Sequence, residues 1–118
     1  MLCMLVLLAG VGGHVLEFLE CNVWCSDTQA FLAADNKTWN PFLTAQPGFI
    51  RKEILASPAV GSNCTFTMSI LWQSREIWKS IDPQKLAAVD AAFVLQFGYE
   101  PLYKQKPTAE GYDVIATL

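Results

Sequence analysis

The sequence predicts an α+β fold of the ferredoxin-like type, with elements in the order strand, helix, strand, strand, helix, strand. Three observations predict it: alternating apolar residues typical of strands, apolar residues at three- and four-residue steps typical of helices, and turns containing Pro and Gly between them. In this βαββαβ order, two crossovers place both helices on one face of a four-stranded antiparallel sheet. The opposite face of the sheet is then left open.

The first strand and the first helix are recognised by their apolar spacing. In "HVLEFLE", residues 14–20, alternate side chains point to opposite faces. Over residues 28–46, bulky side chains recur at helical steps: Phe31, Leu32, Asp35, Trp39, Phe42 and Leu43. Pro41 cannot donate a backbone hydrogen bond, so we expect a kink or break at 38–40. The Pro-Gly dipeptide that follows ends the helix.

A hairpin of two strands comes next. "FIRKEILASP", which starts at residue 49, is predicted to place Ile50 and Ile54 on one face. Its other face carries Phe49, Arg51, Glu53 and Leu55. "CTFTMSILWQ", residues 64–73, is the clearest alternation, and one face carries Phe66, Met68, Ile70 and Trp72. This pattern is typical of a half-buried strand.

The last third predicts a short helix, a longer helix and a strand. Ser74 is the expected cap of the short helix "SREIWKSI". Pro83 lies in the first turn of the longer helix, which runs to Gly98. A polar connection, residues 99–110, leads to the closing strand "GYDVIATL", residues 111–118.

Composition limits the classes of function. The chain has 118 residues, of which 53% are hydrophobic and 16% charged, so residues 14–118 predict a single domain whose surface is partly covered. A homodimer through the open sheet face provides this cover, as does another protein. The net charge of -3 provides no basic stripe, which excludes nucleic acid as a partner.

Residues 1–13, "MLCMLVLLAGVGG", form a hydrophobic N-terminal segment. Its apolar run is far shorter than the ~20 residues of a membrane-spanning helix, so no transmembrane span is expected. A signal-peptide core, a cut-down or mis-started gene model, the tail end of a longer targeting segment and a hydrophobic arm that docks on a partner remain alternatives. In a secreted chain, Asn36 in "NKT" and Asn63 in "NCT" would be glycosylation acceptors, although such triplets often arise by chance.

The cysteines and the histidine predict no metal site. Cys3, Cys21, Cys25 and Cys64 match neither a zinc ribbon nor a Cys-x-x-Cys redox pair. We expect packing or loop thiols, with a disulfide or metal role for Cys21 and Cys25 as the alternative. His14 is the only histidine and is expected at the surface.

The segments "FLAAD", "QPGFIRKEI" and "LWQSREIWKSI" resemble a small family from cyanobacteria and photosynthetic eukaryotes. That family is related to the antibiotic-biosynthesis-monooxygenase-like, dimeric α+β barrel superfamily. The matching positions lie between Val15 and Leu118, and they are Glu17, Asp35, Trp39, Pro47, Gly48, Phe49, Lys52, Glu53, Trp72, Ser74, Arg75, Glu76, Trp78, Lys79, Ile81 and Tyr112. The residues before His14, the stretch "CNVWCSD" and Pro41 depart from the family pattern.

The resemblance implies a ligand cavity between the sheet and its helices. Asp35 and Trp39 are the catalytic candidates, because a carboxylate beside an indole in an apolar pocket gains proton affinity and can act as a base toward a phenol. Met68, Trp72 and Arg75 are the ligand-binding candidates. The packing alternative is that Asp35 bonds to Arg75 or a strand amide while the tryptophans fill the core.

The resemblance also implies a function and a location. It predicts a protein that binds a small hydrophobic ligand and, if it is an enzyme, oxidises an aromatic or hydrophobic substrate without a cofactor. Haem, with His14 as ligand or base, is the alternative. The competing function is a non-catalytic accessory subunit of a larger, photosynthetic assembly. A chloroplast or other plastid compartment is favoured over the secretory route.

Overall fold

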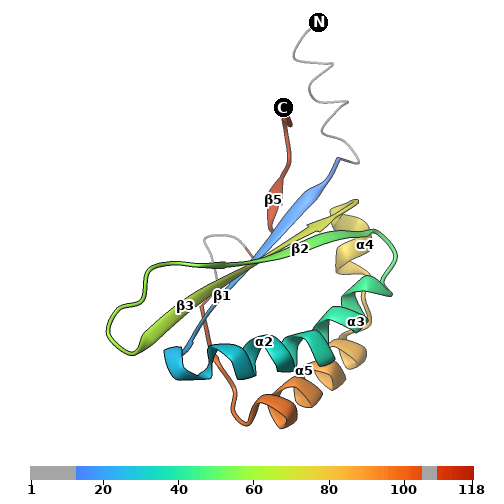
Figure 1. The fold of residues 1–118 in the computed structure, drawn as a ribbon. Helices are drawn as coiled ribbons and strands as arrows, with labels where there is room; N and C mark the ends of the chain where they lie inside the picture. Colours follow the sequence, from blue (N-terminus) through green and yellow to red (C-terminus); the bar gives the residue numbers. More distant parts are fainter. Residues whose placement is uncertain (1–12, 105–108) are drawn as a thin grey trace, which may run out of the picture.

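The computed structural model describes residues 13–104 and 109–118, which form one sheet with helices packed against it (Figure 1). The elements in chain order are β1 (Val15–Trp24), η1 (Cys25–Asp27), α2 (Thr28–Lys37), α3 (Trp39–Thr44), β2 (Phe49–Ala56), β3 (Asn63–Trp72), α4 (Arg75–Lys79), α5 (Pro83–Phe97), β4 (Leu102–Lys104) and β5 (Tyr112–Asp113). Residues 1–12 of the predicted hydrophobic segment lie outside the described residues. Of the helices described, none combines the length and apolarity needed to cross a bilayer.

The sheet has the predicted ferredoxin-like arrangement. Its strand order is β2-β3-β1-β4, β5 also pairs with β1, and all pairs are antiparallel. β1 and β3 therefore form the centre, with the end of the chain on the far side of β1. The sheet has five strands rather than four, because the last strand is divided into two pieces beside β1.

The division of the last strand corrects two predictions. The expected strand at residues 111–118 is reduced to β5, and β4 lies within residues 99–110, which were expected to be a polar connection. Arg75 Nε on α4 donates to the backbone carbonyl of Glu110 at 2.9 Å. The backbone just before β5 is therefore bonded to α4.

Helices α2, α3 and α5 all lie on one face of the sheet, as predicted (Figure 1). Beneath that face, one buried cluster consists of Cys21, Val23, Phe31, Ala34, Phe66, Met68 and Phe93. A second consists of Val15, Leu43, Ile70 and Trp72. Trp39 packs against both clusters. The inward residues of β1 and β3 thus meet the apolar sides of the helices.

The first helix breaks where Pro41 predicted. α2 ends at Lys37 and α3 begins at Trp39, with Thr38 between them. The Thr38 N–H donates to the carbonyl of Asp35 at 3.3 Å, which closes α2. Pro41 lies within the first turn of α3, where its missing N–H costs little.

β2 contains a bulge that changes its predicted faces. Phe49 and Arg51 lie opposite consecutive residues of β3, so Ile50 is the extra residue. Phe49 packs against the second buried cluster and Ile54 against the first, while Ile50 stays 41% exposed. The prediction that Ile50 and Ile54 share a face is therefore wrong, because one inserted residue reverses the alternation before it.

The second helical region follows the prediction. The side chains of Ser74 and Asp82 accept backbone N–H bonds at the starts of α4 and α5. Pro83 is the first residue of α5. Gly98 ends α5 with a φ of 109°, a conformation that glycine adopts without steric cost.

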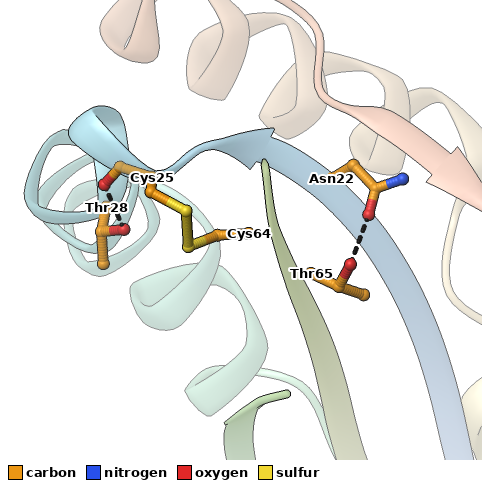
Figure 2. The surroundings of a disulfide bond; sticks show 5 residues. All are labelled: Asn22, Cys25, Thr28, Cys64 and Thr65. Carbon is orange, nitrogen blue, oxygen red and sulfur yellow. Dashed lines mark hydrogen bonds between the residues drawn. A yellow bond between two sulfur atoms is a disulfide. The ribbon is translucent and has the colours of Figure 1, made fainter. Parts of the chain in front are cut away.

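Cys25 and Cys64 form a disulfide that joins η1 to β3 (Figure 2). The expectation of loop or packing thiols is wrong for this pair, because the β1–β3 ladder brings their Cα atoms to 4.9 Å across 39 positions of sequence. Closing a loop of that length stabilises a fold by roughly 4 kcal/mol in the chain-entropy description. Cys21 is a free, buried thiol, and burial, reinforced by nearby Asp35, raises its pKa to about 12.

Candidate functional site

A cavity of about 430 Å³ lies between the inner face of the sheet and the helices. Most of its wall is apolar and includes Leu19, Leu43, Met68, Ile70, Trp78 and Phe93. Ala87 on α5 and Glu100 before β4 also line it, although both are exposed. The mouth of the cavity therefore lies between α5 and the segment that leads into β4.

Four of the five predicted site residues border this cavity: Asp35, Trp39, Met68 and Trp72. Arg75, the fifth, lies outside the cavity wall. Its Nη1 pairs with Asp113 Oδ1 at 2.9 Å. The structure thus places Arg75 where it holds β5 to α4, rather than where it would contact a ligand in the cavity.

Asp35 and Lys52 form a buried ion pair in the wall. Lys52 Nζ donates to Asp35 Oδ2 at 2.5 Å and to Asn40 Oδ1 at 2.8 Å. The Asp35 and Lys52 side chains are only 5% and 9% exposed, so bulk salt screens them weakly. The packing alternative expected Asp35 to bond to Arg75 or a strand amide. The partner of Asp35 is Lys52 instead. Lys52 lies two residues before Ile54, which faces the helices, so the Lys52 side chain also points toward α2.

Glu17 supplies a second acidic group in the wall, and it is partly buried. Its Oε1 accepts a hydrogen bond from Trp72 Nε1 at 3.0 Å. Burial raises the pKa of the Glu17 carboxyl above its ordinary value, and the Trp72 bond and the charges of Lys79 and Lys52 offset this only in part. A carboxyl with raised proton affinity inside a cavity is suited to general acid-base chemistry.

Glu17 and Lys52 lie at the same level of the sheet. Both are Cα partners of Ile70, Glu17 from β1 and Lys52 from β2. Because directly opposed side chains share a face, the carboxyl and the ammonium flank Ile70 and point into the same cavity. Sequence reasoning missed both as site residues. One feature of the sequence could have identified them: a charged residue at a strand position that faces inward, such as Glu17 between Val15 and Leu19.

Further polar groups lie near the mouth. Tyr103 on β4 lines the cavity while remaining 37% exposed. Desolvation raises the pKa of the Tyr103 hydroxyl above its usual value, and Cys21 and acidic neighbours raise this pKa by smaller amounts. The hydroxyl therefore stays protonated. Desolvation, and then Asp90, raise the pKa of Glu100 as well.

The described wall does not fit haem. His14 is exposed at the start of β1 and is not among the residues that line the cavity. The haem alternative needs a histidine beside the pocket, and the described part of the wall contains none. Within residues 13–104 and 109–118, no three His, Cys, Asp or Glu side chains gather closely enough to hold a metal ion.

Neither a scan against protein-family models nor a search of curated proteins finds a match to this chain. Among solved structures, the chain is similar to one described as "Putative antibiotic biosynthesis monooxygenase from Nitrosomonas europaea". The two share 15% sequence identity with a TM-score of 0.45, over 81% of this chain and 92% of that one. At that distance the likeness transfers no residue role to this chain.

Removing one member of the Asp35–Lys52 pair is expected to lower the free energy of unfolding by about 3–5 kcal/mol, because the partner is left as a buried, uncompensated charge. Urea unfolding of Asp35→Leu and of Lys52→Met measures this loss. The double variant should recover most of it. Arg51→Met is the control, since its ion pair with Glu53 is exposed and worth less than about 1 kcal/mol. Strictly additive losses in the double variant would contradict the pairing.

The raised pKa of Glu17 predicts a pH dependence of stability. Since the folded-state pKa lies above the unfolded value near 4.5, the native state holds an extra proton between the two values. Stability from this group is therefore fully present below pH 4.5 and is lost as pH rises through the folded-state pKa. Urea unfolding from pH 4.5 upward should show a steeper fall for the wild type than for Glu17→Gln. Parallel curves would rule out this role of Glu17.

Proposed function

We propose that the protein binds a small, largely apolar molecule in the cavity and directs one acidic hydroxyl or anionic group of that molecule toward Glu17 and Lys52. The observation that carries this proposal is that one cavity of about 430 Å³ combines apolar walls with the carboxyl of Glu17 and the ammonium of Lys52, which lie among its ionisable groups. Ligand pockets typically have volumes of roughly 300–1,000 Å³, with few convergent polar groups.

The packing alternative does not account for the cavity. Trp39 and Trp72 do pack in the core, as that alternative expects, and Asp35 is paired with a cation. The space between them nevertheless stays open, whereas protein interiors are normally filled to the density of organic crystals. An open apolar space with charged groups in its wall favours a ligand over simple packing.

The geometry favours Glu17 over Asp35 as the base. Asp35 Oδ2 already accepts a hydrogen bond from Lys52. Within residues 13–104 and 109–118, the carboxyl of Glu17 has one hydrogen-bond donor, the indole N–H of Trp72, and its pKa is raised. Glu17 would accept the proton of a bound phenol, and the ammonium of Lys52 would stabilise the resulting phenolate. Oxidation of that phenolate by dioxygen, in the manner of cofactor-independent monooxygenases, is the catalytic extension of this proposal.

Binding can be tested with phenols of one, two and three fused rings, from phenol through 2-naphthol to 2-anthrol, by isothermal titration calorimetry. The wild type is expected to bind the larger members. Ala87→Trp should fill the mouth of the cavity and weaken the affinity for these phenols at least about tenfold, which corresponds to roughly 1.4 kcal/mol of binding free energy. Ala88→Trp is the matched control, because Ala88 is exposed on the same helix and lies outside the wall. Equal affinity in both variants, or no binding by the wild type, would contradict the proposal.

A second candidate function, assembly, is favoured by the open face of the sheet. Leu16, Phe18 and Tyr112 form an outer apolar patch on the face opposite the helices, beside Leu71, which is already buried. The ring centroids of Phe18 and Tyr112 lie 5.5 Å apart in an edge contact. Tyr112 is 39% exposed. We propose that a second copy of the chain covers this patch, since face-to-face packing of two sheets buries such residues.

Phe18→Glu is expected to convert a dimeric wild type into a monomer, because it would bury a charge in the interface. Sedimentation velocity at micromolar concentration measures the mass of each form. Leu102→Glu is the control, since Leu102 is 65% exposed at the other end of the outer face. A wild type that is monomeric under these conditions, or a control that dissociates equally, would remove the support for this interface.

A further inference from the structure

One corner of the sheet carries features that the cavity does not explain. Trp24 is the last residue of β1, and it is 55% exposed. Asn63, the first residue of β3, is its direct Cα partner across the ladder. Directly opposed residues of antiparallel strands place their side chains on the same face. Val23 beside Trp24 is buried toward the helices, so Trp24 and Asn63 both face outward.

Asn63 begins the triplet Asn-Cys-Thr, and its side chain is available for modification. Asn63 is exposed, and its side-chain amide makes no hydrogen bond within the part of the chain that the structure describes. Its backbone N–H and carbonyl already pair with Val60, each at 3.0 Å. Asn36, in the other triplet, differs: it lies within α2, and its Oδ1 accepts a hydrogen bond from Asn40 at 3.2 Å.

The disulfide is an independent observation on the same corner. Cys64 is the middle residue of the triplet, and its partner Cys25 directly follows Trp24 (Figure 2). Disulfides form and persist mainly in oxidising compartments such as the lumen of the secretory pathway. Two thiols lose two protons and two electrons there to a thiol-disulfide oxidoreductase. The same compartment attaches glycans to asparagine in Asn-x-Ser/Thr triplets.

We propose that Asn63 carries an N-linked glycan whose first sugar packs on the exposed indole of Trp24, and that the chain folds in an oxidising secretory compartment. In the transfer, the amide nitrogen of Asn63 bonds to the anomeric carbon of the first sugar. The bond from that carbon to the pyrophosphate of a lipid-linked oligosaccharide breaks, and the amide loses one proton. The apolar face of the sugar then covers the ring of Trp24, opposite Asn63 in the ladder.

Mass spectrometry of the full chain tests the modification. The chain is secreted behind a cleavable leader from insect cells grown with the mannosidase inhibitor kifunensine, which keeps the glycans of the oligomannose type. The tryptic peptide 53–75 is mapped before and after treatment with peptide-N-glycosidase F. The glycan mass is expected on this peptide in the wild type, in Asn36→Gln and in Thr65→Ser, which retains the hydroxyl of the triplet. It should be absent in Asn63→Gln. If export fails, the peptide is read from the membrane fraction of the cells.

A disulfide-bonded chain with unmodified Asn63 would overturn the proposal, including one in which only Asn36 is glycosylated. The same peptide from protein isolated from its natural source must also carry the glycan. An unmodified peptide there would overturn the proposed compartment even if the insect-cell chain is modified.

Thermal unfolding tests the contact with Trp24. Endoglycosidase H leaves the first sugar in place and should leave the Tm unchanged, whereas peptide-N-glycosidase F removes that sugar and should lower the Tm by about 4 °C, a shift typical of losing one stabilising contact in a small domain. In Trp24→Ala the two enzymes should give the same Tm. Peptide-N-glycosidase F converts the glycosylated asparagine into an aspartate. The variant Asn63→Asp, produced in bacteria without a glycan, is the control for that change of side chain. An equal drop in Trp24→Ala would show that the sugar does not use the indole.

Discussion

The ten-residue ladder between β1 and β3 is the constraint on which the rest of this structure depends. It pairs Val15 with Trp72 at one end and Trp24 with Asn63 at the other, without interruption. Because side chains alternate between the two faces, a shift of one residue would move every inward residue outward. The ladder therefore fixes three features together: which residues wall the cavity, which form the outer apolar patch, and which cysteines meet.

The cavity persists because its walls are held by polar contacts as well as by packing. Lys52 bonds to residues from both halves of the broken helix, Asp35 on α2 and Asn40 on α3. This ties the helix layer to β2 across an opening that apolar contacts alone would tend to close. The break at Thr38 is part of the same arrangement, since it allows α2 and α3 to present these two side chains to one lysine.

Local patterns in the sequence predicted the order of the elements, the helix break at Pro41, the Ser74 cap of α4 and the place of Pro83 in the first turn of α5, because each depends on neighbouring residues. The face of Phe49 was mispredicted, since a bulge is invisible in a simple alternation. The Cys25–Cys64 disulfide and the importance of Glu17 depend on the register between distant strands. Four of the five candidate site residues, which the family resemblance suggested, do line the cavity, and helical and strand periodicity points them inward.

The outer face of the sheet has two ends of different chemistry, and this makes the two proposals for it compatible. At one end lies the outer apolar patch around Phe18 and Tyr112. At the other end, Asn22 accepts a hydrogen bond from Thr65 (Figure 2). Trp24 and Asn63 are the next outward-facing pair along the ladder. A glycan is strongly hydrated and cannot be buried in a sheet-to-sheet contact without losing that hydration. A dimer of the glycosylated chain would therefore have to meet through the Phe18 end, so that an interface centred on Asn22 and Thr65 is excluded whenever Asn63 is occupied.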